Sequence, residues 1–176
     1  PVLTHARDGV KKAKENDCDM VIAAGGGSVI DEAKAIAAGA KYDGDLWDFL
    51  SGRARIKDAL PIFTVLTIPA TGSEMNQGCV ITNEATKQKF SATSPKLFPT
   101  VSILDPETTM TLPAAQAANG GVDTLAHLIE GYFTTADADV TITDELVHAI
   151  ARSAIAGTDR ILADPKDYDA RASMMW

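Results

Sequence analysis

Cysteine is scarce in this sequence of 176 residues, where Cys18 and Cys79 are the only two and belong to no Cys-x-x-Cys pair. Neither a disulfide framework nor a zinc-thiolate site is indicated, and we expect two reduced, partly buried thiols. No apolar run approaches the ~20 residues that a bilayer span requires, and the first residues lack a basic segment followed by an apolar core. We therefore expect a cytoplasmic protein with no membrane partner.

Positive charge is also scarce, because 16 Lys and Arg residues stand against 24 Asp and Glu residues, which gives a net charge of -8 at pH 7. This balance argues against polynucleotide binding, which requires a basic face, and favours a small-molecule partner. With 45% apolar and 23% charged residues, the chain has the composition of a globular protein. Its length allows one ordinary domain or parts of two small ones.

The two ends of the sequence lack the usual signals of a start and a stop. Pro1 is not an initiator methionine, and residues 170–176 are good helix formers without a glycine stop or a charged cap. We expect both ends to be cut rather than finished.

A βα unit is predicted near the start of the chain. Residues 5–16 have the pattern of an exposed helix, and residues 19–24 form a short apolar run typical of a buried parallel strand. Glycines at 25–27 follow this run. Ser28 then begins a second helix with Asp31 three positions later, which resembles a capping box, so we expect Ser28 to cap the helix.

The glycine loop at residues 25–28 lies where the strand hands over to the helix. There the backbone can approach a ligand closely, and the helix N-terminus offers unpaired N–H groups with a partial positive charge, so a pyrophosphate fits. The pattern is not Gly-x-Gly-x-x-Gly, however, and a tight turn with nothing bound explains the glycines equally well.

The rest of the chain divides into two kinds of pattern. Three further strands are predicted, at residues 62–68, 79–82 and 101–104, with short helical turns at 47–50. From Pro113 onward, apolar residues recur at intervals of three and four, which is typical of helices. We therefore predict an α/β portion over residues 1–108 and an all-helical portion over 109–176.

A turn rich in small hydroxyl residues, Thr67 to Glu74, follows the strand at 62–68. The C-terminal ends of strands in a doubly wound sheet face the ligand crevice, so hydroxyls at this point can reach a nucleotide. Plain turn chemistry by Thr, Ser and Gly is the alternative. Lys89 lies in the next hairpin-like segment and by itself has the pattern of a surface lysine.

Asp123 and His127 are four residues apart in a predicted helix, so their side chains project from one face about one turn apart. A carboxylate and an imidazole at this spacing can share a divalent ion such as Fe, Mn or Zn, with further ligands from elsewhere. An Asp to His hydrogen bond within the helix is the alternative. We assign the other histidines, His5 and His148, to structure or surface.

These segments together resemble the iron-containing alcohol dehydrogenase family, and the shortened turn at residues 69–74 is most similar to its butanol dehydrogenase and broad-range aldehyde reductase branch. The resemblance covers essentially the whole chain. Its most specific parts are Leu104-Asp105-Pro106, Leu112-Pro113 and the run from Ala118 to Leu125 followed by Glu130.

The resemblance implies a role for each candidate residue. Gly26, Gly27 and Ser28 would hold the cofactor pyrophosphate, Thr67 and Thr71 would contact the nucleotide, Lys89 would reach its phosphate or ribose, and Asp123 and His127 would be two metal ligands. It also implies a Rossmann-like α/β domain followed by a helical domain, the architecture of dehydroquinate synthase, with the metal and nicotinamide in the cleft between them. We therefore expect a homodimer or higher oligomer that uses NAD or NADP and Fe, or alternatively Zn, on a small alcohol or aldehyde.

The sequence departs from the family pattern in two ways. The segment that distinguishes NAD from NADP precedes Pro1 in the family, and two further metal-binding histidines follow the position of Trp176. The chain therefore contains two of four expected ligands. Two alternatives remain open: a glycerol dehydrogenase type of enzyme with the same fold, and a non-catalytic nucleotide-binding or assembly piece.

Overall fold

A computed structural model describes residues 1–134 and 140–176 of the chain. The chain forms two compact units. The first unit comprises Pro1–Leu66 and Gly72–Ile103, and the second comprises Thr67–Thr71 and Leu104–Trp176.

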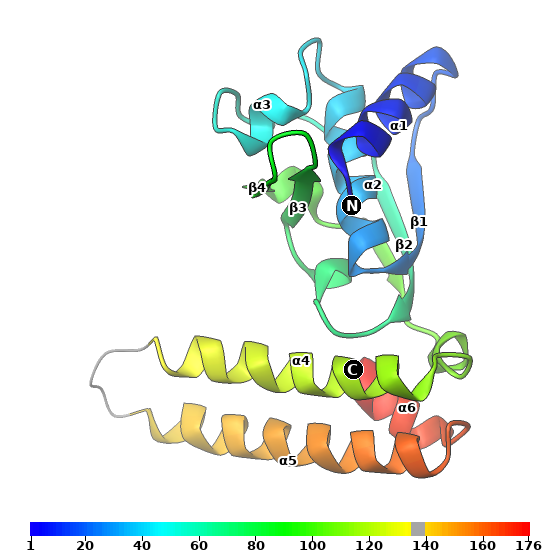
Figure 1. The fold of residues 1–176 in the computed structure, drawn as a ribbon, viewed down its shortest axis with the longest axis vertical. Helices are drawn as coiled ribbons and strands as arrows, with labels where there is room; N and C mark the ends of the chain where they lie inside the picture. Colours follow the sequence, from blue (N-terminus) through cyan, green and yellow to red (C-terminus); the bar gives the residue numbers. More distant parts are fainter. Residues whose placement is uncertain (135–139) are drawn as a thin grey trace. The chain divides into compact units, whose positions relative to one another are not determined.

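The first unit contains three α-helices and five strands, whose order is visible in Figure 1. The elements are α1 (Leu3–Glu15), β1 (Val21–Gly26), α2 (Gly27–Ala40), α3 (Trp47–Leu50), β2 (Ile62–Ile68), β3 (Gly78–Asn83), β4 (Gln88–Thr93) and β5 (Val101–Ile103), with 3-10 turns η1 (Ser73–Met75) and η2 (Pro95–Leu97). Every strand and helix expected here is present, and β2 has the predicted bounds.

Two small sheets organise these strands. The first has the order β1-β2-β5, and β2 runs parallel to β5 with Phe63 opposite Val101 and Val65 opposite Ile103. The second is an antiparallel hairpin of β3 and β4 that pairs Gly78 with Thr93. Strand β4 was predicted only as hairpin-like chain, because five of its six side chains are exposed and the sequence shows no alternation.

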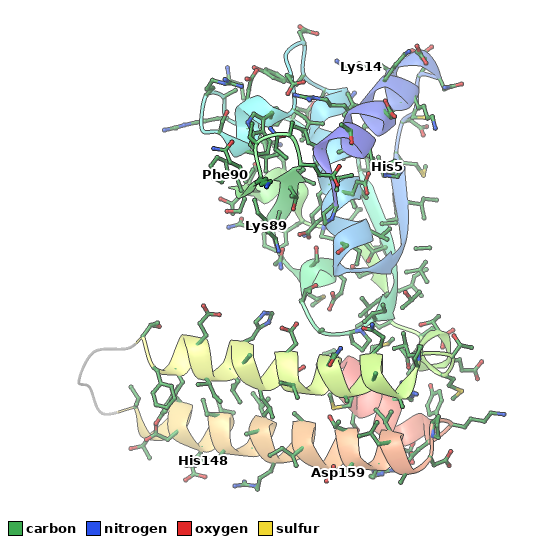
Figure 2. The ribbon with its side chains drawn as sticks, viewed as in Figure 1. His5, Lys14, Lys89, Phe90, His148 and Asp159 are labelled. Atoms are coloured by element: carbon green, nitrogen blue, oxygen red, sulfur yellow. The ribbon has the colours of Figure 1, made fainter. Side chains whose placement is uncertain are left out.

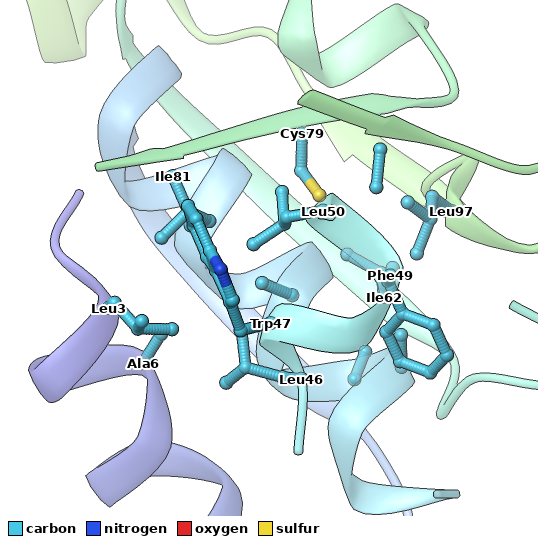
Figure 3. Packing of buried hydrophobic residues seen from close by; sticks show 14 of the residues in the cluster. Leu3, Ala6, Leu46, Trp47, Phe49, Leu50, Ile62, Cys79, Ile81 and Leu97 are labelled. Carbon is cyan, nitrogen blue, oxygen red and sulfur yellow. The ribbon is translucent and has the colours of Figure 1, made fainter. Parts of the chain in front are cut away.

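One apolar core holds the first unit together, and the part shown in Figure 3 gathers side chains from α1, α3, β2 and β3. Helix α2 presents alanines to this core, so the backbone of the helix can approach its neighbours closely. Trp47 is buried in the core and stacks on Phe90 of β4 with ring centroids 5.5 Å apart. Cys79 is buried in the same core, whereas Cys18 is exposed.

The second unit is helical. After the 3-10 turn η3 (Pro106–Thr109) it contains α4 (Ala114–Tyr132), α5 (Thr141–Ala163) and α6 (Tyr168–Met175), and α4 and α5 lie side by side (Figure 1). A Cβ atom on Gly121 would lie 2.1 Å from Thr158 Oγ1, so the close approach of α4 and α5 requires glycine at this position. Within residues 1–134 and 140–176, no helix is long and apolar enough to cross a membrane.

Candidate functional site

The glycine loop lies at the junction of β1 and α2. Gly26 ends the strand and occupies the N-cap of the helix with an extended backbone, φ -88° and ψ -170°. No side chain caps this helix end. The first N–H groups of α2, beginning at Gly27 and Ser28, therefore meet the requirement for an anion site, namely donors at the positive end of a 14-residue helix.

The prediction that Ser28 caps the helix is wrong. Ser28 is the second residue of α2 and is exposed, and the expected partner Asp31 turns to other donors. One carboxylate oxygen of Asp31 accepts from Ser73 Oγ at 2.6 Å, and the other accepts from the backbone N–H of Val80 at 2.9 Å. Tertiary hydrogen bonds have thus replaced the local capping box, and glycine at the N-cap leaves the first amides of the helix without a side-chain acceptor.

Lys34, one turn after Asp31, is fully buried and fixes the same turn from a second point. Its Nζ donates to Asn76 O at 2.8 Å, to Asn76 Oδ1 at 2.9 Å and to Gly78 O at 2.9 Å. Burial lowers the pKa of Lys34, and the nearby Asp31 opposes this effect. The helix that follows the glycine loop is therefore tied to the turn at residues 72–78, and no local sequence pattern indicates this link.

Glu74, which lies in the same turn, is a second acidic residue near Asp31 and Lys34. The residue is 8% exposed, and its Oε2 is buried without a hydrogen-bond partner among the described residues. Its backbone carbonyl accepts from Ser102 Oγ at 2.6 Å, and Ser102 Oγ in turn accepts from Thr64 Oγ1 at 2.8 Å. The hydroxyls of β2 and β5 thus hold the backbone of the turn.

Three other residues, Thr67, Thr71 and Lys89, were expected to contact the nucleotide. Thr67 ends up half-buried near the end of β2, and Thr71 is exposed just before Gly72, whose φ of 64° makes the sharp bend of the turn. Both threonines belong to the second unit. Lys89 lies on the hairpin (Figure 2), where it is exposed and pairs opposite Thr82. The glycine loop and Lys89 are therefore both features of the first unit.

Asp123 and His127 project from one face of α4, as the spacing predicted. Asp123 Oδ1 and His127 Nε2 are 3.9 Å apart, and the side chains are 43% and 52% exposed. This separation is too long for a hydrogen bond and leaves both donor atoms open to a metal ion. Among residues 1–134 and 140–176, no third histidine, cysteine or carboxylate joins the pair to make a metal cluster.

The remaining histidines have other surroundings. His5 Nδ1 lies 2.6 Å from Glu32 Oε1, which links α1 to α2. His148 is exposed on α5 (Figure 2). The aromatic side chains of the first unit also differ in exposure. Phe98 is half-exposed, whereas Trp47 and Phe49 are buried in the core.

Comparison with known protein families decides the identity of this arrangement. The family model described as iron-containing alcohol dehydrogenase matches residues 1–106, and the model for the C-terminal part of the same family matches residues 117–176. The chain belongs to the iron-containing alcohol dehydrogenase family. The resemblance read from the Asp105 to Glu130 pattern is thereby confirmed.

Individual members of the iron-containing alcohol dehydrogenase family extend this result. The probable NADH-dependent butanol dehydrogenase 1 of Bacillus subtilis is 44% identical over 176 residues, which are 100% of this chain and 45% of the relative. The NADPH-dependent aldehyde reductase YqhD of Escherichia coli is 40% identical over 179 residues, 100% of this chain and 46% of the relative. The chain thus spans about half the length of the curated relatives that it matches.

Solved structures of the family show the same fold. The crystal structure of NADH-dependent butanol dehydrogenase A from Thermotoga maritima matches with a TM-score of 0.95 and 46% identity, covering 100% of this chain and 44% of that one. Sulfoacetaldehyde reductase from Bifidobacterium kashiwanohense in complex with NAD⁺ matches with a TM-score of 0.89 and 30% identity, covering 99% and 46%. The predicted fold class, a Rossmann-like α/β portion followed by helices, is confirmed.

Proposed function

We propose that this chain is the part of a metal-dependent, NAD(P)-linked alcohol dehydrogenase or aldehyde reductase that carries the phosphate loop and two metal ligands. Its substrate would be a small alcohol or aldehyde, and the relatives named above are butanol dehydrogenases and an aldehyde reductase. The observation that carries the proposal is the strand-to-helix junction at Gly26, where α2 begins without a side-chain cap. Membership of the family supports it.

Residues 1–108 would form the nucleotide-binding portion. The amides of Gly26, Gly27 and Ser28 would donate to the cofactor pyrophosphate, favoured by the positive end of α2. Gly25 has a packing role instead, because a Cβ there would meet the side chain of Val29 at 2.6 Å. We assign Thr67 and Thr71 to nucleotide contacts and Lys89 to the phosphate or ribose, by family resemblance.

Residues 109–176 would begin the metal-binding domain. Asp123 would supply a hard, negatively charged oxygen and His127 a neutral nitrogen, a donor set that suits iron or zinc. When bound, such an ion acts as a Lewis acid on the substrate oxygen. The two side chains would hold the ion near α4, and their exposed positions leave room for the further ligands that a catalytic site requires. We also propose a cytoplasmic homodimer or higher oligomer.

A second candidate function is nucleotide binding without catalysis. It is favoured by the metal pair, which no third ligand joins among the described residues. Half a metal site binds weakly, because each missing ligand removes a share of the binding free energy. A third candidate is a glycerol dehydrogenase type of activity with the same fold. The sequence pattern from Asp105 to Glu130 favours the alcohol dehydrogenase instead.

The glycine junction is tested by Gly26→Asp and Gly26→Asn. Both side chains are good N-caps and suit the extended backbone at this position, so α2 should remain folded. Only the aspartate places a negative charge where the pyrophosphate would lie. Titration of NADH fluorescence should show about tenfold weaker binding for Gly26→Asp than for Gly26→Asn. Equal NADH affinities of the two variants would contradict the proposal that this loop binds the pyrophosphate.

The metal pair is tested by elemental analysis together with NAD(P)H-coupled reduction of butanal. We compare the chain with its Asp123→Ala and His127→Ala variants and with His148→Ala, which removes an exposed histidine on α5. The dehydrogenase function is supported if the chain binds stoichiometric metal and turns over, if Asp123→Ala and His127→Ala lose both properties, and if His148→Ala keeps them. NADH binding without metal or turnover supports the non-catalytic function.

A further inference from the structure

Arg171 of α6 is a buried cation without a counter-charge. The residue is 3% exposed, and its guanidinium makes one hydrogen bond, from Nε to Pro165 O at 3.1 Å. No carboxylate of the described residues lies within ion-pair distance of it. Arg160 shows the contrast, because its guanidinium is half-exposed and donates twice to Asp167, at 2.9 Å each.

A guanidinium that is so little exposed is costly to desolvate, and the protein supplies one acceptor in place of the water that has been lost. Burial accordingly lowers the pKa of Arg171, with no neighbouring charge opposing that effect. Arginine stays protonated in proteins all the same, so the charge persists. The two Nη nitrogens have no acceptor among residues 1–134 and 140–176.

These nitrogens belong to a residue that lines a cavity inside the second unit. The cavity has a volume of about 20 Å³, and its wall is otherwise mostly apolar, with Ile161 and Leu112 among the lining residues. A volume of ~10–15 Å³ holds one water-sized group, so the space suits a monatomic or triatomic ligand.

A second source of positive potential reaches the same space. Gln116 and Ala117, which line the cavity, lie in the first turn of the 19-residue helix α4. No side chain caps this helix, whose N-cap is Pro113. The positive end of α4 and the charge of Arg171 therefore act on one small volume.

We propose that this cavity binds a small monovalent anion of the size of chloride or formate, held by the guanidinium of Arg171 at the positive end of α4. The anion would accept the hydrogen bonds that the protein leaves unmade and would balance the buried charge. Binding to the folded unit alone would stabilise it in proportion to the anion concentration. This site is separate from the proposed nucleotide and metal functions and does not depend on them.

The test measures thermal unfolding of the whole chain by circular dichroism at constant ionic strength. Sodium chloride or formate replaces sodium gluconate, whose anion is too large for the cavity. We expect a saturable rise of about 4 °C in the unfolding midpoint. Line broadening of the chloride nuclear resonance, reversed by formate, should report the same site directly. An equal midpoint in gluconate and chloride, without line broadening, would overturn the proposal.

Three variants locate the effect. Arg171→Gln removes the charge, and Ala117→Leu fills the cavity while keeping Arg171 and a good helix former. Both should lose the anion response. Arg160→Gln, which removes an exposed guanidinium, should keep it. If Arg171→Gln does not fold, Ala117→Leu decides alone, and an undiminished response in that variant contradicts the proposal.

Discussion

The two units differ in how they bury apolar side chains. The first closes a core of its own, to which α1, α2, α3 and both sheets contribute. The buried apolar residues of the second are few and include Ala154, Ile161, Ala170 and Met175. Its helices leave large apolar side chains in contact with water: Val122, Ile129, Phe133, Ile142, Leu146, Ile150, Ile155 and Leu162.

The difference in buried apolar side chains affects how rigidly each unit holds its candidate site. The glycine loop belongs to a unit whose core and buried Lys34 network fix the surrounding backbone. Asp123 and His127 lie on a helix that packs mainly against one neighbour, through glycine contacts such as that of Gly121 with Thr158. We therefore expect the first unit to be the more stable of the two.

The largest effect on this comparison should come from Lys34→Met. The variant keeps the apolar stem of the side chain but removes the charge, which leaves the carbonyls of Asn76 and Gly78 without their donor. Breaking a buried charged network in this way costs about 3–5 kcal/mol. Urea unfolding should show this loss in the first unit, and the exposed Lys41→Met should change stability little. A loss below about 1 kcal/mol would show that the network contributes little.

A smaller effect is expected in the second unit from Gly121→Ala. The added methyl would lie 2.1 Å from Thr158 Oγ1, so α4 and α5 must move apart, at a cost of about 1–3 kcal/mol. Gly131→Ala is the matched control on the same helix, because nothing lies within 4 Å of its Cβ position. The control should gain about 0.5–1 kcal/mol from helix propensity. Similar responses of the two variants would contradict close packing at Gly121.

The smallest effect in the range up to pH 10 is a pH dependence that belongs to the first unit. Burial raises the pKa of the Cys79 thiol to about 12, whereas an unfolded thiol has its ordinary value of 9.0. The folded state therefore holds a proton that the unfolded state loses, so the stabilisation is complete below pH 9 and is lost as pH rises toward 12. The slope is about 1.4 kcal/mol per pH unit in that range. Urea unfolding of Cys79→Ala between pH 8 and 10 should lack this component, and an unchanged slope would argue against it.

Most of the fold could be predicted from local pattern. The apolar run at Ile62–Ile68 and the periodicity after Pro113 correspond to β2 and to the helices α4, α5 and α6. Strand β4 could not be recognised as a strand, because its polar, exposed residues gain their conformation from pairing with β3.

The candidate site could be predicted only where its geometry is local. Asp123 and His127 are placed by one helical turn, so their spacing was sufficient. The partners of Asp31 and Lys34 lie 42 to 49 residues away along the chain, and no local signal connects them. The failed prediction for Ser28 has the same cause, since Asp31 was already engaged by Ser73 and Val80.

Because the two thiols differ in exposure, Cys18 is a site at which a dye can be attached selectively. Cys18 is exposed just before β1, and Cys79 is buried with a pKa of about 12, so a maleimide dye at neutral pH should react at Cys18 alone. Strand β1 leads from there to the glycine loop, which lies roughly 20–25 Å away along the extended chain. If the cofactor binds at this loop as proposed, a dye at Cys18 would sit within energy-transfer distance of the reduced nicotinamide without obstructing the phosphate site, and the native sequence would serve as an optical reporter of cofactor occupancy.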